Sequence, residues 1–139
     1  MRFKTVRTAL RSYRGLKVWQ ASVELAEETY RVCRAFPASE RFGLASQMRR
    51  AAVSIPANIA EGYGRAHRGD YLRSLSVANG SLKEWETEMI VAGRIGLVTA
   101  EDLRRLMALS DEVGRMLGSL TRSLRRQPLH PTPSHPTPS

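Results

Sequence analysis

The sequence contains a single cysteine, Cys33, and few aromatic side chains. One thiol excludes a disulfide within the chain and a metal site built from several cysteines of one chain. No apolar run approaches the roughly 18 residues that indicate a membrane span, and no apolar segment follows the basic N-terminal stretch. We therefore expect a soluble, cytoplasmic protein with no signal peptide and no membrane partner.

The motifs of common enzyme classes are also missing. The chain has no Cys-x-x-Cys, no His-Glu-x-x-His, no glycine-rich phosphate loop with lysine and no Gly-x-Ser-x-Gly elbow. It lacks the Glu-x-x-His pairs that hold two metal ions inside a helix bundle. His67 is the one histidine outside the C-terminal tail, and we interpret it as a solvated turn residue. These absences predict a protein that is not an enzyme and binds no metal or other cofactor.

Acidic residues are outnumbered by basic ones, 13 against 22, which gives a formal net charge of +9. Six basic side chains and no acid lie in residues 1–17. A second group lies near the end of the last predicted helix, at Arg115, Arg122, Arg125 and Arg126. Basic surfaces attract nucleic acids by releasing condensed counterions. The alternative is that these cations serve solubility and stabilise a helix C-terminus.

The two ends of the chain differ from its middle. Residues 1–15 form a basic arm, and residues 127–139 contain two copies of His-Pro-Thr-Pro-Ser. The prolines forbid a helix there, and the low apolar content predicts a disordered tail. We interpret His130 and His135 as part of that tail rather than as metal ligands. The folded domain is expected to occupy residues 16–126.

Four segments of that domain carry apolar residues at alternating spacings of three and four, which is typical of helices. They cover about residues 16–36, 40–63 and 70–95, and a stretch from Thr99 to about residue 126. Asp70 is the expected N-cap of the third helix, and Thr99 begins a capping-box-like start of the fourth. Connections of about three to six residues favour antiparallel neighbours. The predicted fold class is an all-α, up-and-down four-helix bundle.

Some residues interrupt the apolar stripes. Asn79 and Glu86 lie in a stripe of the third helix, and Glu61 ends the second. A buried carboxylate is costly unless it is paired, so we expect Glu86 or Glu61 to meet an arginine across the bundle or across a subunit interface. Gly114 and Gly118 lower the helix propensity of the fourth helix, and we expect them to allow close contact with another helix.

The most informative stretch is residues 47–62, QMRRAAVSIPANIAEG. It has a helical stripe but carries Pro56 in its interior, where proline costs roughly 3 kcal/mol, so we expect packing to hold a kinked second helix. This stretch resembles the signature of the 23S rRNA intervening sequence protein family, also called S23 or "four helix bundle protein". Further similarity lies in LKVWQ (16–20), the turn 36–44, GSLKE (80–84) and VGRML (113–117), so the resemblance covers about residues 16–126.

The resemblance implies a four-helix bundle that assembles into a cyclic homopentamer. Founding members of the family are encoded within insertions in 23S rRNA genes. A related branch comprises accessory variability determinant proteins of diversity-generating retroelements, which are basic pentamers that bind nucleic acid and a reverse transcriptase. The Ser-Ile-Pro signature is typical of the general family rather than of that branch.

We therefore predict a homopentameric bundle that binds RNA or other nucleic acid through phosphate contacts, which position a strand without reading its sequence. The alternative is a protein-interaction scaffold, such as an accessory subunit of a reverse transcriptase. The basic turn 62–68 adds Tyr63, which is able to stack on a base. The same turn also fits a helix C-cap followed by a solvated loop. The predicted phosphate-binding residues are Arg49, Arg50, Arg65, Arg68, Arg115, Arg122, Arg125 and Arg126.

Overall fold

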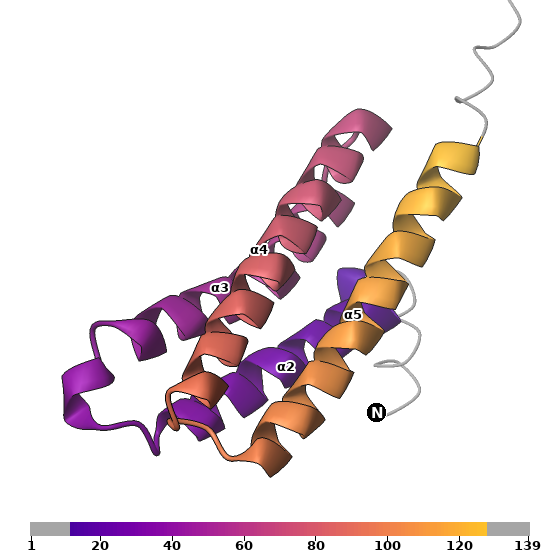
Figure 1. The fold of residues 1–139 in the computed structure, drawn as a ribbon. Helices are drawn as coiled ribbons and strands as arrows, with labels where there is room; N and C mark the ends of the chain where they lie inside the picture. The colour runs from indigo at the N-terminus through magenta and orange to yellow at the C-terminus, as the bar shows by residue number, and fades with distance from the viewer. Residues whose placement is uncertain (1–11, 128–139) are drawn as a thin grey trace, which may run out of the picture.

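The computed structural model describes residues 12–127 as a bundle of four long helices (Figure 1). These helices are α2 (Lys17–Cys33), α3 (Leu44–Tyr63), α4 (Arg68–Arg94) and α5 (Ala100–Arg126). Short 3-10 helices precede two of them, η1 (Tyr13–Gly15) before α2 and η2 (Ala38–Glu40) before α3. The predicted all-α fold is therefore confirmed. Most of the basic arm and both His-Pro-Thr-Pro-Ser repeats lie outside the described residues.

The four helices pack in a ring. Contacts join α2 to α3, α3 to α4, α4 to α5 and α5 back to α2. Short connections make successive helices antiparallel. Because α3 and α5 each lie between α2 and α4 in the ring, α2 and α4 face each other across one diagonal of the bundle (Figure 1). Since α4 and α5 have 27 residues each and α2 has 17, the first half of α4 and the last half of α5 extend beyond the start of α2 (Figure 1).

Trp85 of α4 lies in the centre of this ring, fully buried. Its indole Nε1 donates a hydrogen bond to Thr29 Oγ1 of α2 at 2.9 Å, and that hydroxyl donates to the Leu25 carbonyl at 2.6 Å. The buried polar atoms of both side chains are thus satisfied, as a buried group requires. This bond links the two diagonal helices through the middle of the core.

Helix α3 continues through Pro56, whose side chain is buried, as packing against neighbours requires. The missing amide of proline leaves the turn before it without one hydrogen bond. The carbonyl left without that donor is the one of Ala52, four residues earlier. One turn away, Asn58 Nδ2 donates to the Ser54 carbonyl at 2.7 Å, and the Ser54 hydroxyl pairs with Ser81 of α4 at 2.8 Å. The kink at Pro56 stays a prediction.

Two helix starts differ from those predicted. Helix α3 begins at Leu44 rather than at residue 40, because Ala38–Glu40 form the 3-10 helix η2. The prediction of Asp70 as an N-cap was wrong, because His67 occupies that position. Asp70 lies inside the first turn of α4, where the helix dipole stabilises its negative charge. The start at Thr99 is confirmed, since its hydroxyl accepts a hydrogen bond from the Asp102 amide at 3.1 Å.

The polar residues in the stripes find other partners than those expected. Glu86 accepts a hydrogen bond from the Ser110 hydroxyl at 2.8 Å and pairs with Lys83, while Asn79 is exposed. Glu61 pairs with Arg65 of its own segment rather than across the bundle. An ion pair between helices is made instead by Glu28 of α2 and Arg105 of α5, at 3.0 Å.

The glycines are also used unevenly. A Cβ on Gly114 would lie 3.5 Å from Leu82, so this glycine does face α4 as expected. The prediction for Gly118 was wrong, because the atoms nearest to its Cβ position belong to Arg122 of the same helix. Among the described glycines, Gly62 has the least room, since a Cβ there would lie 2.7 Å from Ser74 of α4. In the described part of the chain, no helix is long and apolar enough to cross a bilayer.

Candidate nucleic-acid interface

The fold brings together five of the eight predicted arginines at one end of the bundle. Arg65 lies in the turn after α3, and Arg68 is the first residue of α4. Arg68 Nη1 donates to the Leu124 carbonyl at 3.3 Å and to the Gln127 carbonyl, which are both at the end of α5. This contact between residues nearly sixty positions apart fixes the start of α4 against the end of α5. The basic end, as we call this surface, consists of Arg65, Arg68, Arg122, Arg125 and Arg126.

The charges of the basic end are only partly neutralised. Arg65 forms an exposed ion pair with Glu61 at 2.7 Å, and the Arg68 guanidinium is occupied by backbone carbonyls. The three α5 arginines are exposed, and none of them pairs with a carboxylate among the described residues. They lie in the C-terminal turns of α5, where the helix dipole also favours cations. Their side chains nevertheless remain available to an external anion.

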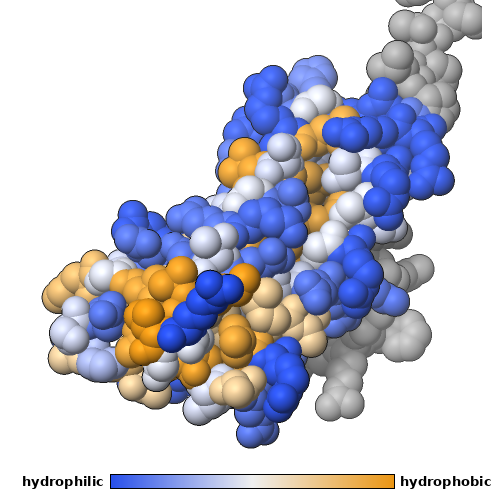
Figure 2. Space-filling model, viewed as in Figure 1, coloured by the Kyte–Doolittle hydropathy of each residue, from blue (hydrophilic) through white to orange (hydrophobic). Residues whose placement is uncertain are grey.

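A groove of about 310 Å³ runs between α4 and α5 next to these arginines. Leu72, Leu75 and Leu117 contribute apolar surface to it, and Arg122 and Arg125 contribute charge. Figure 2 shows the same arrangement, an apolar strip bordered by strongly hydrophilic residues at the end of the bundle where α5 ends. The Arg122 guanidinium lies beside Gly118, since Nη1 is 3.1 Å from the Cβ position of that glycine. Because Gly118 has no side chain, the Arg122 guanidinium has room to lie against the helix at this position.

Arg115 continues the basic end along α5. It precedes Arg122 by seven residues, and Arg126 follows four residues later, which places all three on one face of the helix. The side chain of Arg115 is exposed. At 1.5 Å per residue, the three cations span about 16 Å of the helix axis. Arg73, near the start of α4, is also exposed and extends the charge to the neighbouring helix.

Arg49 and Arg50 do not belong to the basic end. They lie in the first half of α3, and Arg49 is 14 residues before Tyr63, or about 21 Å along the axis. Arg49 Nη2 donates to the Arg41 carbonyl at 3.3 Å, and its guanidinium lies 5.7 Å from the centre of the Tyr30 ring. Arg50 lines a depression that also contains Glu84. Their contact with phosphates stays a prediction, at a different place from the others.

The charge of Arg50 also acts on Glu88, the one buried acid of α4. The side chain of Glu88 is 8 % exposed, and its Oε1 has no hydrogen-bond partner among the described residues. Burial and the neighbouring Glu84 raise the pKa of Glu88 from 4.5 to about 7, and Arg50 offsets part of that rise. No group of three or more potential metal ligands lies within the described residues. Glu88 is thus an isolated carboxyl whose charge depends on pH near neutrality.

The sequence of residues 14–119 matches the family model described as 23S rRNA-intervening sequence protein. The chain belongs to this family. A search of curated proteins found no match. Among solved structures, the chain is similar to a crystal structure of a protein with unknown function from the S23 ribosomal protein family of Bacteroides thetaiotaomicron. The TM-score is 0.71 at 24 % identity, over 76 % of this chain and 95 % of that one, so this likeness concerns the fold.

The family match ends at residue 119, before the last two turns of α5. The signature around Pro56 and the close approach at Gly62 lie inside the matched region, as does the central Trp85. Arg122, Arg125 and Arg126 lie outside it. The family match therefore covers most of the bundle. Most arginines of the basic end lie in the segment that follows the match. Sequence reasoning found these arginines but missed the Arg68 contact, which no local pattern indicates.

Proposed function

We propose that this member of the 23S rRNA-intervening sequence family is a non-enzymatic homo-oligomer that binds RNA or another nucleic acid through its basic end. The observation that carries the proposal is the contact of Arg68 with the end of α5. It gathers cations from the start of α4 and the end of α5 on one surface, beside an apolar groove. Guanidinium groups bind phosphates as bidentate donors, and the contacts carry no sequence information.

The proposal is tested by measuring the affinity for a mixed-sequence single-stranded RNA over a series of salt concentrations. The double variant Arg122→Gln/Arg125→Gln is expected to bind more weakly than wild type at low salt. The slope of log affinity against log salt should also fall by about 0.7 for each lost phosphate contact, or roughly 1.4 in all. The matched control is Arg104→Gln, which removes an exposed arginine near the other end of α5.

Equal slopes for the double variant and for Arg104→Gln would remove the basic end from the proposal. A variant lacking residues 2–11 leaves η1 in place and separates the contribution of the basic arm. If binding is lost with those residues alone, the phosphate contacts lie in the arm. If wild type does not bind RNA even at low salt, the scaffold alternative replaces the proposal.

The proposed oligomer has five copies, as the family resemblance implies. Large apolar side chains exposed on the surface support an assembly, since contiguous apolar patches of monomers are commonly interaction sites. Ile90, Val91 and Ile95 are exposed near the end of α4, where Figure 2 shows an apolar patch. Light scattering of wild type should give about five times the chain mass of 15.6 kDa. A mass of one chain over the whole concentration range would contradict the proposal.

A further inference from the structure

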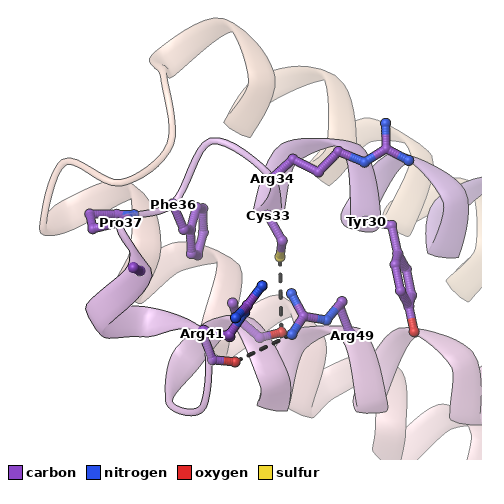
Figure 3. A pocket seen from close by; sticks show the side chains of 9 residues that line it. Tyr30, Cys33, Arg34, Phe36, Pro37, Arg41 and Arg49 are labelled. Atoms are coloured by element: carbon purple, nitrogen blue, oxygen red, sulfur yellow. Dashed lines mark hydrogen bonds between the residues drawn. The ribbon is translucent and has the colours of Figure 1, made fainter.

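A cavity of about 580 Å³ lies between the end of α2 and the start of α3, at the end of α3 remote from Tyr63 (Figure 3). Three arginines contribute to its wall, and they come from three parts of the fold. Arg34 follows α2, Arg41 follows η2 and Arg49 belongs to α3. Among residues 12–127, no acidic side chain lines the cavity. Its volume is in the range of pockets that hold small ligands.

The arginines of this cavity have no ion pair with a carboxylate among the described residues. Glu40 is close in sequence but does not line the cavity, and its Oε2 lies near Gly43 instead. The N-terminus of α3 adds positive potential at the same place, because its N-cap is Gly43, which has no side chain to cap the first amides. The cavity thus carries positive charge from side chains, while the Glu40 carboxylate near Gly43 offsets part of the potential of the helix end.

Arg49 is already held in position. Its side chain is half-buried, Nη2 donates to the Arg41 carbonyl at 3.3 Å, and the guanidinium lies 5.7 Å from the centre of the Tyr30 ring (Figure 3). A guanidinium fixed in this way loses little side-chain entropy when an anion binds. The remaining N–H groups of Arg49 are able to donate to an oxyanion in the cavity.

The wall beside the arginines is aromatic. Tyr30 and Phe36 line the cavity, and Tyr30 is 44 % exposed. Cys33 also lines the cavity. Burial raises the pKa of its thiol, so the thiol adds no negative charge. Aromatic rings in such a place stack on flat ligands, whereas the arginines select an anion. The two preferences together fit a phosphate group attached to a nucleoside.

We propose that this cavity binds a phosphomonoester that carries a nucleobase, either as a free nucleoside monophosphate or as the terminal phosphate of a nucleic-acid strand. Arg49 and Arg41 bind the phosphate, and the Tyr30 ring packs against the base. This site is separate from the basic end, which lies at the other end of α3, and it does not require that proposal to hold.

The test uses isothermal titration calorimetry on the full chain at low salt, with adenosine 5′-monophosphate, inorganic phosphate and adenosine as probes. The monophosphate should bind most tightly, phosphate more weakly, and adenosine not measurably. Arg49→Gln should weaken both phosphate-containing probes by about tenfold or more, because a charge-assisted bidentate contact is lost. Within the variant Tyr30→Leu, the monophosphate should bind no more tightly than phosphate does. The control Arg104→Gln should bind like wild type.

Thermal unfolding checks that each variant is folded, and Arg41→Gln replaces Arg49→Gln if the latter is not. Failure of wild type to bind either phosphate probe would overturn the proposal, as would equal affinities for the Arg41 or Arg49 variant and for Arg104→Gln. Competition with an RNA oligonucleotide, with and without a 5′-phosphate, distinguishes the two sources of the phosphate. Preference for the phosphorylated strand assigns the site to strand ends, and indifference assigns it to free nucleotides. The variant Arg122→Gln/Arg125→Gln should not change binding of the monophosphate, which separates this outcome from the proposed function.

Discussion

Replacing Trp85 with alanine is expected to lower the free energy of unfolding by about 3–5 kcal/mol, the range measured for large aromatic residues removed from cores. Trp85 is fully buried and is the largest such side chain of the described residues. Its removal leaves a cavity at the centre of the four-helix ring and leaves the Thr29 hydroxyl without its donor. A loss of this size is a large fraction of the roughly 5–15 kcal/mol that stabilise a typical domain.

Chemical denaturation followed by circular dichroism measures this loss, since the helices dominate the signal. Thr29→Val should cost less, about 1–3 kcal/mol, because it leaves the indole N–H unsatisfied but keeps the packing. The control Thr87→Ala changes an exposed residue of α4 and should shift stability by less than about 0.5 kcal/mol. A loss below about 1 kcal/mol for Trp85→Ala would show that the indole does not organise the core.

Replacing Glu88 with glutamine is expected to stabilise the protein at pH 8 and to change little at pH 4.5. The pKa of Glu88 is raised from 4.5 to about 7 in the fold, mainly by burial. Folding therefore favours the protonated acid, and wild type loses stability as the pH rises from the unfolded pKa through the folded one. One pKa unit corresponds to about 1.4 kcal/mol, so the gain of Glu88→Gln above pH 7 should reach about 3 kcal/mol.

Denaturation of both proteins at several pH values between 4.5 and 8 measures this difference. The gap between wild type and Glu88→Gln should widen as the pH rises through 7 and level off near pH 8. The control Glu24→Gln alters an exposed acid of α2 and should show no such dependence. A gap that is independent of pH would mean that folding does not shift the pKa of Glu88 and that Arg50 or solvent compensates its burial.

Local patterns of the sequence were sufficient for the helices. The apolar spacing along α4 predicted its buried face, and Leu75, Leu82, Trp85 and Met89 are all fully or almost fully buried. The start at Thr99 followed from a hydroxyl three residues before the amide that donates to it, which is a contact within one turn. Asp70 failed as an N-cap because α4 begins three residues earlier, at a boundary that apolar spacing does not define.

Residues that act through distant partners could not be placed in this way. The sequence grouped the arginines of α5, but Arg68 joined them only because α3, α4 and α5 pack antiparallel. The sequence predicted the same role for Arg49 and Arg50, but these two residues lie in the first half of α3, toward the opposite end of the bundle. Glu86 accepts its hydrogen bond from Ser110 of α5. Gly118 lies against Arg122 of the same helix.

The sequence by itself therefore determined the four helices, their buried faces and the family, because periodicity and caps depend on contacts within one or two turns. The tertiary structure alone decided which charges meet. It placed one set of arginines at the basic end and another around the cavity of Arg49, since the pairing of antiparallel helices sets the distances between residues far apart in the chain.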